Sequence, residues 1–296
     1  MLVTGKTFVV WWTGSLLWGA MLCVVLSSCA TTPATTPAST SDQSRHDSRV
    51  WGSKATLLPS WHRIGRAAAK AARDPQTWAP AMGALLFSAT DWDKDVSDWA
   101  QKHHPVFGSQ GAALRASDDL RDGAKYGAVV TALLTPYGRD RSAAVTGKLK
   151  GMGLQLGAYF ATESVTTVFK RGVARRRPNE ANNRSFPSGH TSAAFAAGTL
   201  ARRNVAASGF SDMTSSMLDV GFISLGVGIS WARVEGGMHY PSDVFAGAAL
   251  GYFIAAVVND AFVGEHFNGE HRSGVPRVSL QTGRSLVNID LNWSLY

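Results

Sequence analysis

Residues 185–201 read SFPSGHTSAAFAAGTLA, and this stretch decides the fold that the sequence predicts. Proline and serine are the residues that most often set a helix start, and here Pro187 and Ser188 precede a run of small residues. We therefore expect a helix over about residues 188–205. Unpaired N–H groups at such a start attract anions, and Gly189 lets a ligand approach the backbone.

The rest of the central region has the same character. Apolar residues recur at helical spacing, and the further expected helices are 61–73, 76–90, 93–103, 112–137, 142–170, 214–232 and 242–262. The longest clean apolar run of this region, residues 244–259, has 16 uncharged residues, whereas a spanning helix needs ~20 apolar ones. We expect an all-α bundle of buried helices over residues 56–270, without membrane-spanning segments.

The C-terminal end follows another period. Val287, Ile289 and Leu291 alternate with polar residues, which is typical of a half-buried strand. Val278 and Leu280 precede a Thr-Gly turn, so residues 271–296 are expected to hold a short β-hairpin.

The N-terminal end resembles a bacterial lipoprotein signal. Residues 7–28 carry no charge, and Leu26-Ser27-Ser28-Cys29 fits the pattern in which the chain is cut before Cys29 and this cysteine is lipidated. An uncleaved membrane anchor over residues 1–28 is the alternative. Residues 29–55, rich in Thr, Pro and Ser, are expected to be an extended tether. Ala30 after the cysteine suggests the periplasmic side of the cell envelope, with an anchor in the outer membrane.

Composition excludes several classes. With 45% hydrophobic and 17% charged residues, the 296-residue chain is not a disordered one. Its 2 Cys exclude a disulfide scaffold and a cysteine-based metal centre. The net charge of +8 is modest, and because basic residues do not interleave with aromatics we expect no nucleic-acid partner.

Two further segments carry chemistry. A basic stretch, KRGVARRRP over residues 170–178, ends the helix expected at 142–170. Residues 233–243, RVEGGMHYPSD, join the last two expected helices, and they place His239 four residues before Asp243. That spacing across a helix start allows the carboxylate to hold one imidazole nitrogen and to leave the other free as a nucleophile or base.

Together the three segments resemble the type 2 phosphatidic acid phosphatase (PAP2) superfamily, whose pattern is K-x6-R-P, P-S-G-H and S-R-x5-H-x3-D. The chain departs from it at Ala232, where the family often has serine. The matching residues are Lys170, Arg177, Pro178, Pro187, Ser188, Gly189, His190, Arg233, His239 and Asp243.

The resemblance implies a helical bundle and a metal-independent phosphatase without a cofactor. In the family's terms, His239 attacks phosphorus and forms a phosphohistidine, Asp243 orients it, and His190 protonates the leaving group. The phosphate ligands implied are Lys170, Arg177, Ser188, Gly189 and Arg233. The expected substrate is a phosphorylated lipid or another small phosphoester, with lipids favoured because a lipidated Cys29 keeps the site near a bilayer.

Other interpretations stay open at this point. A soluble-substrate acid phosphatase has the same motifs, and vanadate-dependent haloperoxidases share the anion site. A non-catalytic envelope lipoprotein is the third alternative. Residues 91–95, DWDKD, imitate the start of a calcium loop, but positions six and twelve are Val96 and Lys102. We assign no metal there and expect a helix with Val96, Trp99 and His103 facing inward.

The lipidation hypothesis makes a direct prediction. Cells expressing the full chain should label it with radioactive palmitate, and globomycin should block its processing, because Cys29 is the modified residue. Cys29→Ser should abolish the label, whereas Cys23→Ser, six residues upstream, serves as the matched control and should keep it. Persistence of the label in Cys29→Ser would refute lipidation at this position.

Overall fold

The computed structural model describes residues 51–136, 141–264, 277–282 and 287–292. The predicted signal peptide, Cys29 and the tether up to residue 50 lie outside the described residues. The contacts divide the chain into two units, with the boundary after Gly264.

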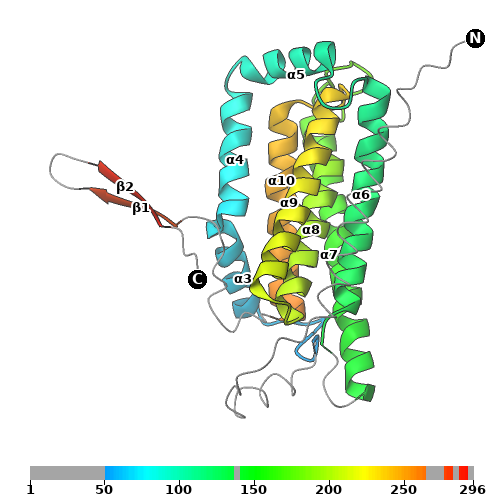
Figure 1. The fold of residues 1–296 in the computed structure, drawn as a ribbon, viewed down its shortest axis with the longest axis vertical. Helices are drawn as coiled ribbons and strands as arrows, with labels where there is room; N and C mark the ends of the chain where they lie inside the picture. The colour runs from blue at the N-terminus through cyan, green and yellow to red at the C-terminus, as the bar shows by residue number, and fades with distance from the viewer. Residues whose placement is uncertain (1–50, 137–140, 265–276, 283–286, 293–296) are drawn as a thin grey trace, which may run out of the picture. The chain divides into compact units, whose positions relative to one another are not determined.

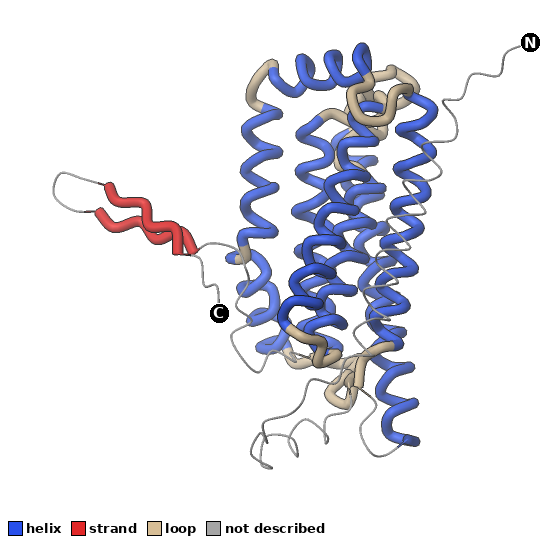
Figure 2. Tube along the Cα trace, in the orientation of Figure 1, coloured by secondary structure: helices blue, strands red, loops and turns tan. Residues whose placement is uncertain are grey.

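Within residues 51–136 and 141–264, the first unit consists of α-helices and their connections, so the all-α prediction is confirmed there (Figures 1 and 2). The α-helices are α3 (Trp61–Arg73), α4 (Pro75–Ser88), α5 (Trp92–His103), α6 (Gln110–Leu133), α7 (Arg141–Val173), α8 (Gly189–Ala207), α9 (Asp212–Glu235) and α10 (Pro241–Val258), and a π-helical turn, η1 (Asn259–Val263), continues α10.

Local sequence sets where these helices begin. Ser60, Ser109, Ser188 and Ser211 are N-caps whose hydroxyls accept a backbone N–H from the first turn. Such caps satisfy N–H groups that have no partner inside the helix. Proline begins both α4 and α10, where its missing N–H is not needed.

The centre of the unit is α8, which packs against α6, α7, α9 and α10. Its contact with α10 is close enough to involve backbone. A Cβ added to Gly251 would lie 2.2 Å from the carbonyl oxygen of Ser192, and one added to Gly247 would lie 2.6 Å from that of Ser188. Glycine thus lets α10 approach the start of α8, which fixes the two helix starts beside each other.

The ends of several elements differ from expectation by up to four residues, and two of these differences bear on the site and the core. The helix expected at 142–170 continues to Val173, so Lys170 lies within its last turn. Trp51, which was expected in the tether, is 4% exposed and packs with Ala132 and Val263. The packed part of the chain therefore includes residues before position 56.

The expectation that no helix is long and apolar enough to span a membrane is wrong. Residues Asp212–Glu235 and Pro241–Gly264 are each long and apolar enough to cross a bilayer, by length and composition alone, and 39% and 61% of their apolar windows are buried. Uninterrupted apolar runs are shorter than the helices that contain them, because each helix continues past the charged residues that end the run. Core helices of soluble proteins have the same length and composition.

The second unit holds the predicted hairpin. Strand β1 (Arg277–Thr282) pairs antiparallel with β2 (Val287–Asn292), and the register joins Arg277 to Asn292 and Thr282 to Val287. The alternation in the sequence thus predicts the strands, and the structure adds their register.

The close approach of α8 and α10 can be tested by adding one methyl group. Gly251→Ala should lower the free energy of unfolding by about 1–3 kcal/mol, because its Cβ has no room against the Ser192 backbone. Gly157→Ala in α7 is the control, since a Cβ there meets nothing within 4 Å and should raise stability by up to about 1 kcal/mol. Urea unfolding of both variants measures the difference. Equal midpoints would contradict the close packing.

Candidate active site

The three predicted segments meet at one end of the bundle, which α5 crosses (Figure 1). The loop after α7 is tied to the loop before α10, because Asn179 donates its N–H to the carbonyl of Gly237 at 3.0 Å. The start of α8 is tied to α10, because the N–H of Ser188 donates to the carbonyl of Asp243 at 2.9 Å. Residues far apart in the sequence therefore line one site.

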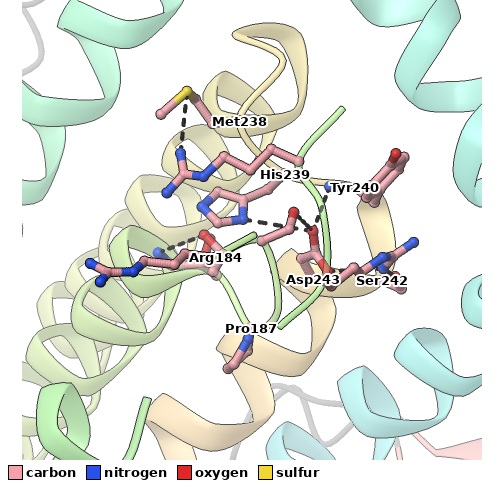
Figure 3. Close-up of polar contacts among 12 residues, drawn as sticks. Arg184, Pro187, Met238, His239, Tyr240, Ser242 and Asp243 are labelled. Carbon is pink, nitrogen blue, oxygen red and sulfur yellow. Dashed lines mark hydrogen bonds and ion pairs between the residues drawn. The ribbon is translucent and has the colours of Figure 1, made fainter. Parts of the chain in front are cut away.

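His239 lies in the loop before α10 and is 1% exposed. Its Nδ1 faces Oδ2 of Asp243 at 3.7 Å, as Figure 3 shows. This distance is longer than a hydrogen bond, and Nδ1 has no hydrogen-bond partner among the described residues. The carboxylate thus lies beside Nδ1 without a hydrogen bond to it, and Nε2 is the ring nitrogen not turned to the carboxylate.

Asp243 is fully buried, and both of its carboxylate oxygens accept hydrogen bonds. Oδ2 accepts from the hydroxyl of Ser185 and from the N–H of Tyr240, and Oδ1 accepts from Nη1 of Arg175 at 2.9 Å. Burial raises the pKa of Asp243, but the His239 ring, Arg175 and Ser185 outweigh burial and hold it below the usual range. The carboxylate is thus ionised and fixed in place.

Arg175 is a site residue that the sequence motifs do not name, although it lies inside the basic stretch 170–178. Its guanidinium is held between two carboxylates, because Nη1 contacts Asp243 and Nη2 donates to Asp93 at 2.7 Å. It also lies 4.1 Å from the centre of the Tyr240 ring. Arg175 therefore braces the carboxylate that faces His239.

Asp93 corrects the expected inward face of α5. The buried residues of this helix are Asp93, Ser97 and Ala100, whereas Trp99 is 48% exposed. Asp93 also accepts the N–H and hydroxyl of Ser242 in the first turn of α10. Asp93 is therefore buried because it binds both Arg175 and the start of α10. Hydrophobic spacing cannot predict such polar contacts.

His190 lies in the first turn of α8, and its partners come from α6. Its Nε2 is 2.6 Å from Oδ1 of Asp118 and 2.8 Å from Nη1 of Arg121. The sequence reasoning named neither residue. Burial lowers the pKa of His190 to about 4, Arg233 and Arg121 lower it as well, and Asp118 raises it.

Lys170 and Arg177 are held by neutral groups. Nζ of Lys170 donates to the carbonyls of Arg184 and Pro187 at 2.9 and 2.6 Å. Nε of Arg177 donates to Oδ1 of Asn182 at 3.0 Å. Their positions are therefore set by oxygen atoms that do not cancel their charge.

Arg233, in the last turn of α9, is 5% exposed. Its Nη1 donates to the hydroxyl of Ser117 on α6 at 3.2 Å, and its Nε has no hydrogen-bond partner among the described residues. In the described part of the chain, none of Lys170, Arg177 and Arg233 forms an ion pair with a carboxylate. We refer to these three residues as the cation cluster.

The members of the cation cluster repel one another. Burial lowers the pKa of Lys170 to about 8, and the charges of Arg177 and Arg233 lower it as well, while Asp243 raises it. Burial likewise lowers the pKa of Arg233 to about 10, with Arg177 the next cause. Clustered like charges with depressed pKa values are typical of an anion-binding site.

The same surroundings keep His239 neutral. Burial lowers its pKa to about 3, and Lys170 and Arg233 lower it as well, although Asp243 raises it. Because a lowered pKa favours the uncharged ring, His239 has a free nitrogen lone pair at every pH above about 3.

Ser188 and Gly189 form the start of α8 as predicted. The Ser188 hydroxyl oxygen accepts from the hydroxyl of Thr191 at 3.0 Å, which leaves its own proton to donate. A Cβ on Gly189 would make only ordinary contacts, the nearest with Lys170 at 3.5 Å. Packing within the protein does not require a glycine at this position, and the role of Gly189 toward a ligand stays a prediction.

Glu235 is another missed residue. It is fully buried at the end of α9, and it accepts hydrogen bonds from the N–H groups of Val106 and Phe107 and from the Trp231 indole. It therefore holds the connection between α5 and α6.

Among the described residues, no three His, Cys, Asp or Glu side chains gather as metal ligands would.

Comparison with known proteins finds the family named by the motifs. Residues 152–265 match the PAP2 superfamily. No curated protein sequence matches the chain. Among solved structures, a transmembrane PAP2 type phosphatidylglycerolphosphate phosphatase from Bacillus subtilis is similar, with a TM-score of 0.33 and 16% sequence identity over 83% of this chain and 93% of that one.

The cation cluster predicts pH-dependent anion binding. Sulfate keeps its charge between about pH 6 and 9, so its affinity should fall as the pH rises through about 8, where Lys170 loses its proton. Lys170→Met should weaken sulfate binding at least about tenfold at pH 6 and remove this fall. Isothermal titration calorimetry measures both effects, with Lys150→Met on the same helix as the control. An unchanged pH dependence in Lys170→Met would contradict this role of Lys170.

Proposed function

Because residues 152–265 match the PAP2 superfamily, we propose that the protein is a phosphatase that hydrolyses phosphomonoesters or pyrophosphates through a phosphohistidine. One observation carries the proposal. In the described part of the chain, three cations without carboxylate partners, the buried Arg233 and the half-buried Lys170 and Arg177, lie at the same site as a buried and neutral histidine, His239. Phosphoryl transfer needs a positioned nucleophile and neutralisation of charge on three oxygens, and this arrangement supplies both.

In the proposed first step, Nε2 of His239 attacks phosphorus. The N–P bond forms, the P–O bond to the leaving group breaks, and its electron pair goes to the leaving oxygen, which takes a proton from His190. The ring of His239 becomes positive as the bond forms, and the fixed carboxylate of Asp243 at 3.7 Å stabilises that charge.

In the second step, water attacks the phosphohistidine. The O–P bond forms, the N–P bond breaks, and the electron pair returns to His239 while His190 takes the proton of the water. The cation cluster, the Ser188 hydroxyl and the Gly189 N–H hold the phosphoryl oxygens in both steps. These groups supply the positive charge that a metal ion supplies in other phosphatases, so the proposed mechanism is metal-independent.

The preferred substrate class is a phosphorylated lipid at a membrane surface. This choice rests on the sequence before the described residues, where a lipidated Cys29 would hold the site near a bilayer on the periplasmic side of the envelope. The two helices that are long and apolar enough to cross a membrane also favour membrane association. A soluble phosphoester fits the same anion site, and a substrate panel separates the two.

A vanadate-dependent haloperoxidase is the second candidate, because vanadate has the shape and charge that suit the cation cluster. This candidate is tested by measuring bromide oxidation by peroxide after vanadate is added. Bromide turnover without phosphatase activity would replace the proposal, whereas vanadate inhibition of phosphatase activity supports it.

The nucleophile can be tested directly. His239→Ala should reduce hydrolysis of a chromogenic phosphomonoester and of phosphatidic acid by at least about 10³-fold, because no other group takes the phosphoryl. His62→Ala, at an exposed position of α3, is the control and should retain activity. Full retention in His239→Ala would eliminate the proposed nucleophile.

The intermediate gives an independent prediction. With a radiolabelled nitrophenyl phosphate, whose leaving group needs no proton in the first step, His190→Asn should accumulate an acid-labile, base-stable phosphoryl group, because the second step lacks its base. Label on a peptide containing residue 239 supports the mechanism, and label elsewhere in the chain contradicts it. The double variant with His239→Ala should carry no label.

A further inference from the structure

Helix α6 contributes side chains to the site although it lies before the segment that matches the superfamily, which begins at residue 152. It packs against α8 and α9. Ser117 accepts from Arg233, and Asp118 and Arg121 both contact His190. The superfamily motifs therefore say nothing about these three residues, and their roles follow from their contacts.

A single ring nitrogen cannot satisfy both partners at once. Nε2 of His190 either carries a proton, and then donates, or carries a lone pair, and then accepts. An ionised carboxylate only accepts and a guanidinium only donates, so Asp118 at 2.6 Å suits the protonated nitrogen and Arg121 at 2.8 Å suits the bare one.

We propose that Asp118 and Arg121 are positioning residues that exchange as hydrogen-bond partners of His190 Nε2 when this nitrogen gains or loses its proton. The inference rests on the proposed function, in which His190 gives a proton in the first step and takes one in the second. When the leaving oxygen takes the Nε2 proton, the hydrogen bond to Asp118 is lost and the bare nitrogen accepts from Arg121. When water returns a proton, the bond to Asp118 forms again.

The geometry favours exchange over a fixed pair. Asp118 is 55% exposed and Arg121 is 26% exposed, so both side chains can move without unpacking a core. They also lie near each other, with Nη2 of Arg121 3.7 Å from Oδ1 of Asp118. The partner that His190 releases is therefore held beside the ring by the other one.

The charges around His190 act in opposite directions. From α6, Asp118 raises the pKa of His190 and Arg121 lowers it, and Arg233 of α9 also lowers it. From α7, Lys170 lies beside Gly189, the residue before His190. From α10, the carboxylate of Asp243 is occupied by Arg175, Ser185 and the Tyr240 N–H.

The test is a histidine titration by nuclear magnetic resonance on the full chain labelled at histidine Cε1, with the His190→Asn spectrum identifying the His190 signal. Asp118→Asn should lower the pKa of His190, and Arg121→Gln should raise it, each by about one unit. Asp119→Asn is the matched control, because it removes the same charge from the neighbouring exposed position of α6 and should leave the titration unchanged.

The exchange requires opposite shifts, but two fixed charges would also produce them, so the position of the proton on the neutral ring decides. In a chain labelled with nitrogen-15 at histidine, the neutral ring of His190 should keep Nε2 bare and Nδ1 protonated, and Arg121→Gln should move that proton to Nε2. Shifts in the same direction, or no shift in Arg121→Gln, would overturn the exchange. The Arg121→Gln arm moves the titration toward neutral pH, so it decides the question even where the Asp118→Asn titration falls below the pH at which the chain stays folded.

The proposed function has its own readout in the same variants. The alkaline limb of the kcat/KM profile on a phosphomonoester should move with the titration, to lower pH in Asp118→Asn and to higher pH in Arg121→Gln. Opposite NMR shifts in a chain that turns over no phosphoester would refute the phosphatase and leave the pairing intact. Turnover with an unmoved titration would refute the pairing alone.

Discussion

The site depends on the buried carboxylate of Asp243. A buried charge without partners is costly, and this one is satisfied by donors from different segments, Arg175 and Ser185 from the loop after α7 and Tyr240 from the loop before α10. Arg175 continues the connection to Asp93 on α5. Satisfying this carboxylate therefore requires the loop after α7 and the loop before α10 to meet, with α5 bound through Arg175. Those two loops and the helix ends that precede them carry the cation cluster and His239.

The sequence predicts the helices well because their residues are amphipathic or small in pattern and because start signals mark where they begin. Serine caps and prolines mark the starts of α8, α9 and α10, so periodicity and capping agree. The site residues that were predicted share a motif with fixed spacing, and the structure places them at one end of the bundle. Their chemical roles are assigned by resemblance and by the physical argument above, and they stay predictions.

What the sequence does not reveal is polar pairing between distant elements. Asp93 lies 82 residues from Arg175, and Asp118 lies 72 residues from His190, so no local pattern connects them. Hydrophobic spacing points α5 the wrong way because it treats an acid as a solvated residue. The one local sign was the line of small or polar residues Asp93, Ser97 and Ala100, whose spacing marks the face of α5 that packs.

The mutual repulsion within the cation cluster has a consequence for how the protein responds to its surroundings. Charges held together in a buried place weaken the folded state, and any oxyanion that settles among them relieves that strain. Inorganic phosphate released by the proposed reaction is such an anion. The same repulsion that favours substrate binding thus also favours retention of the product. Where phosphate is abundant, the free energy of unfolding would rise while turnover falls through product inhibition.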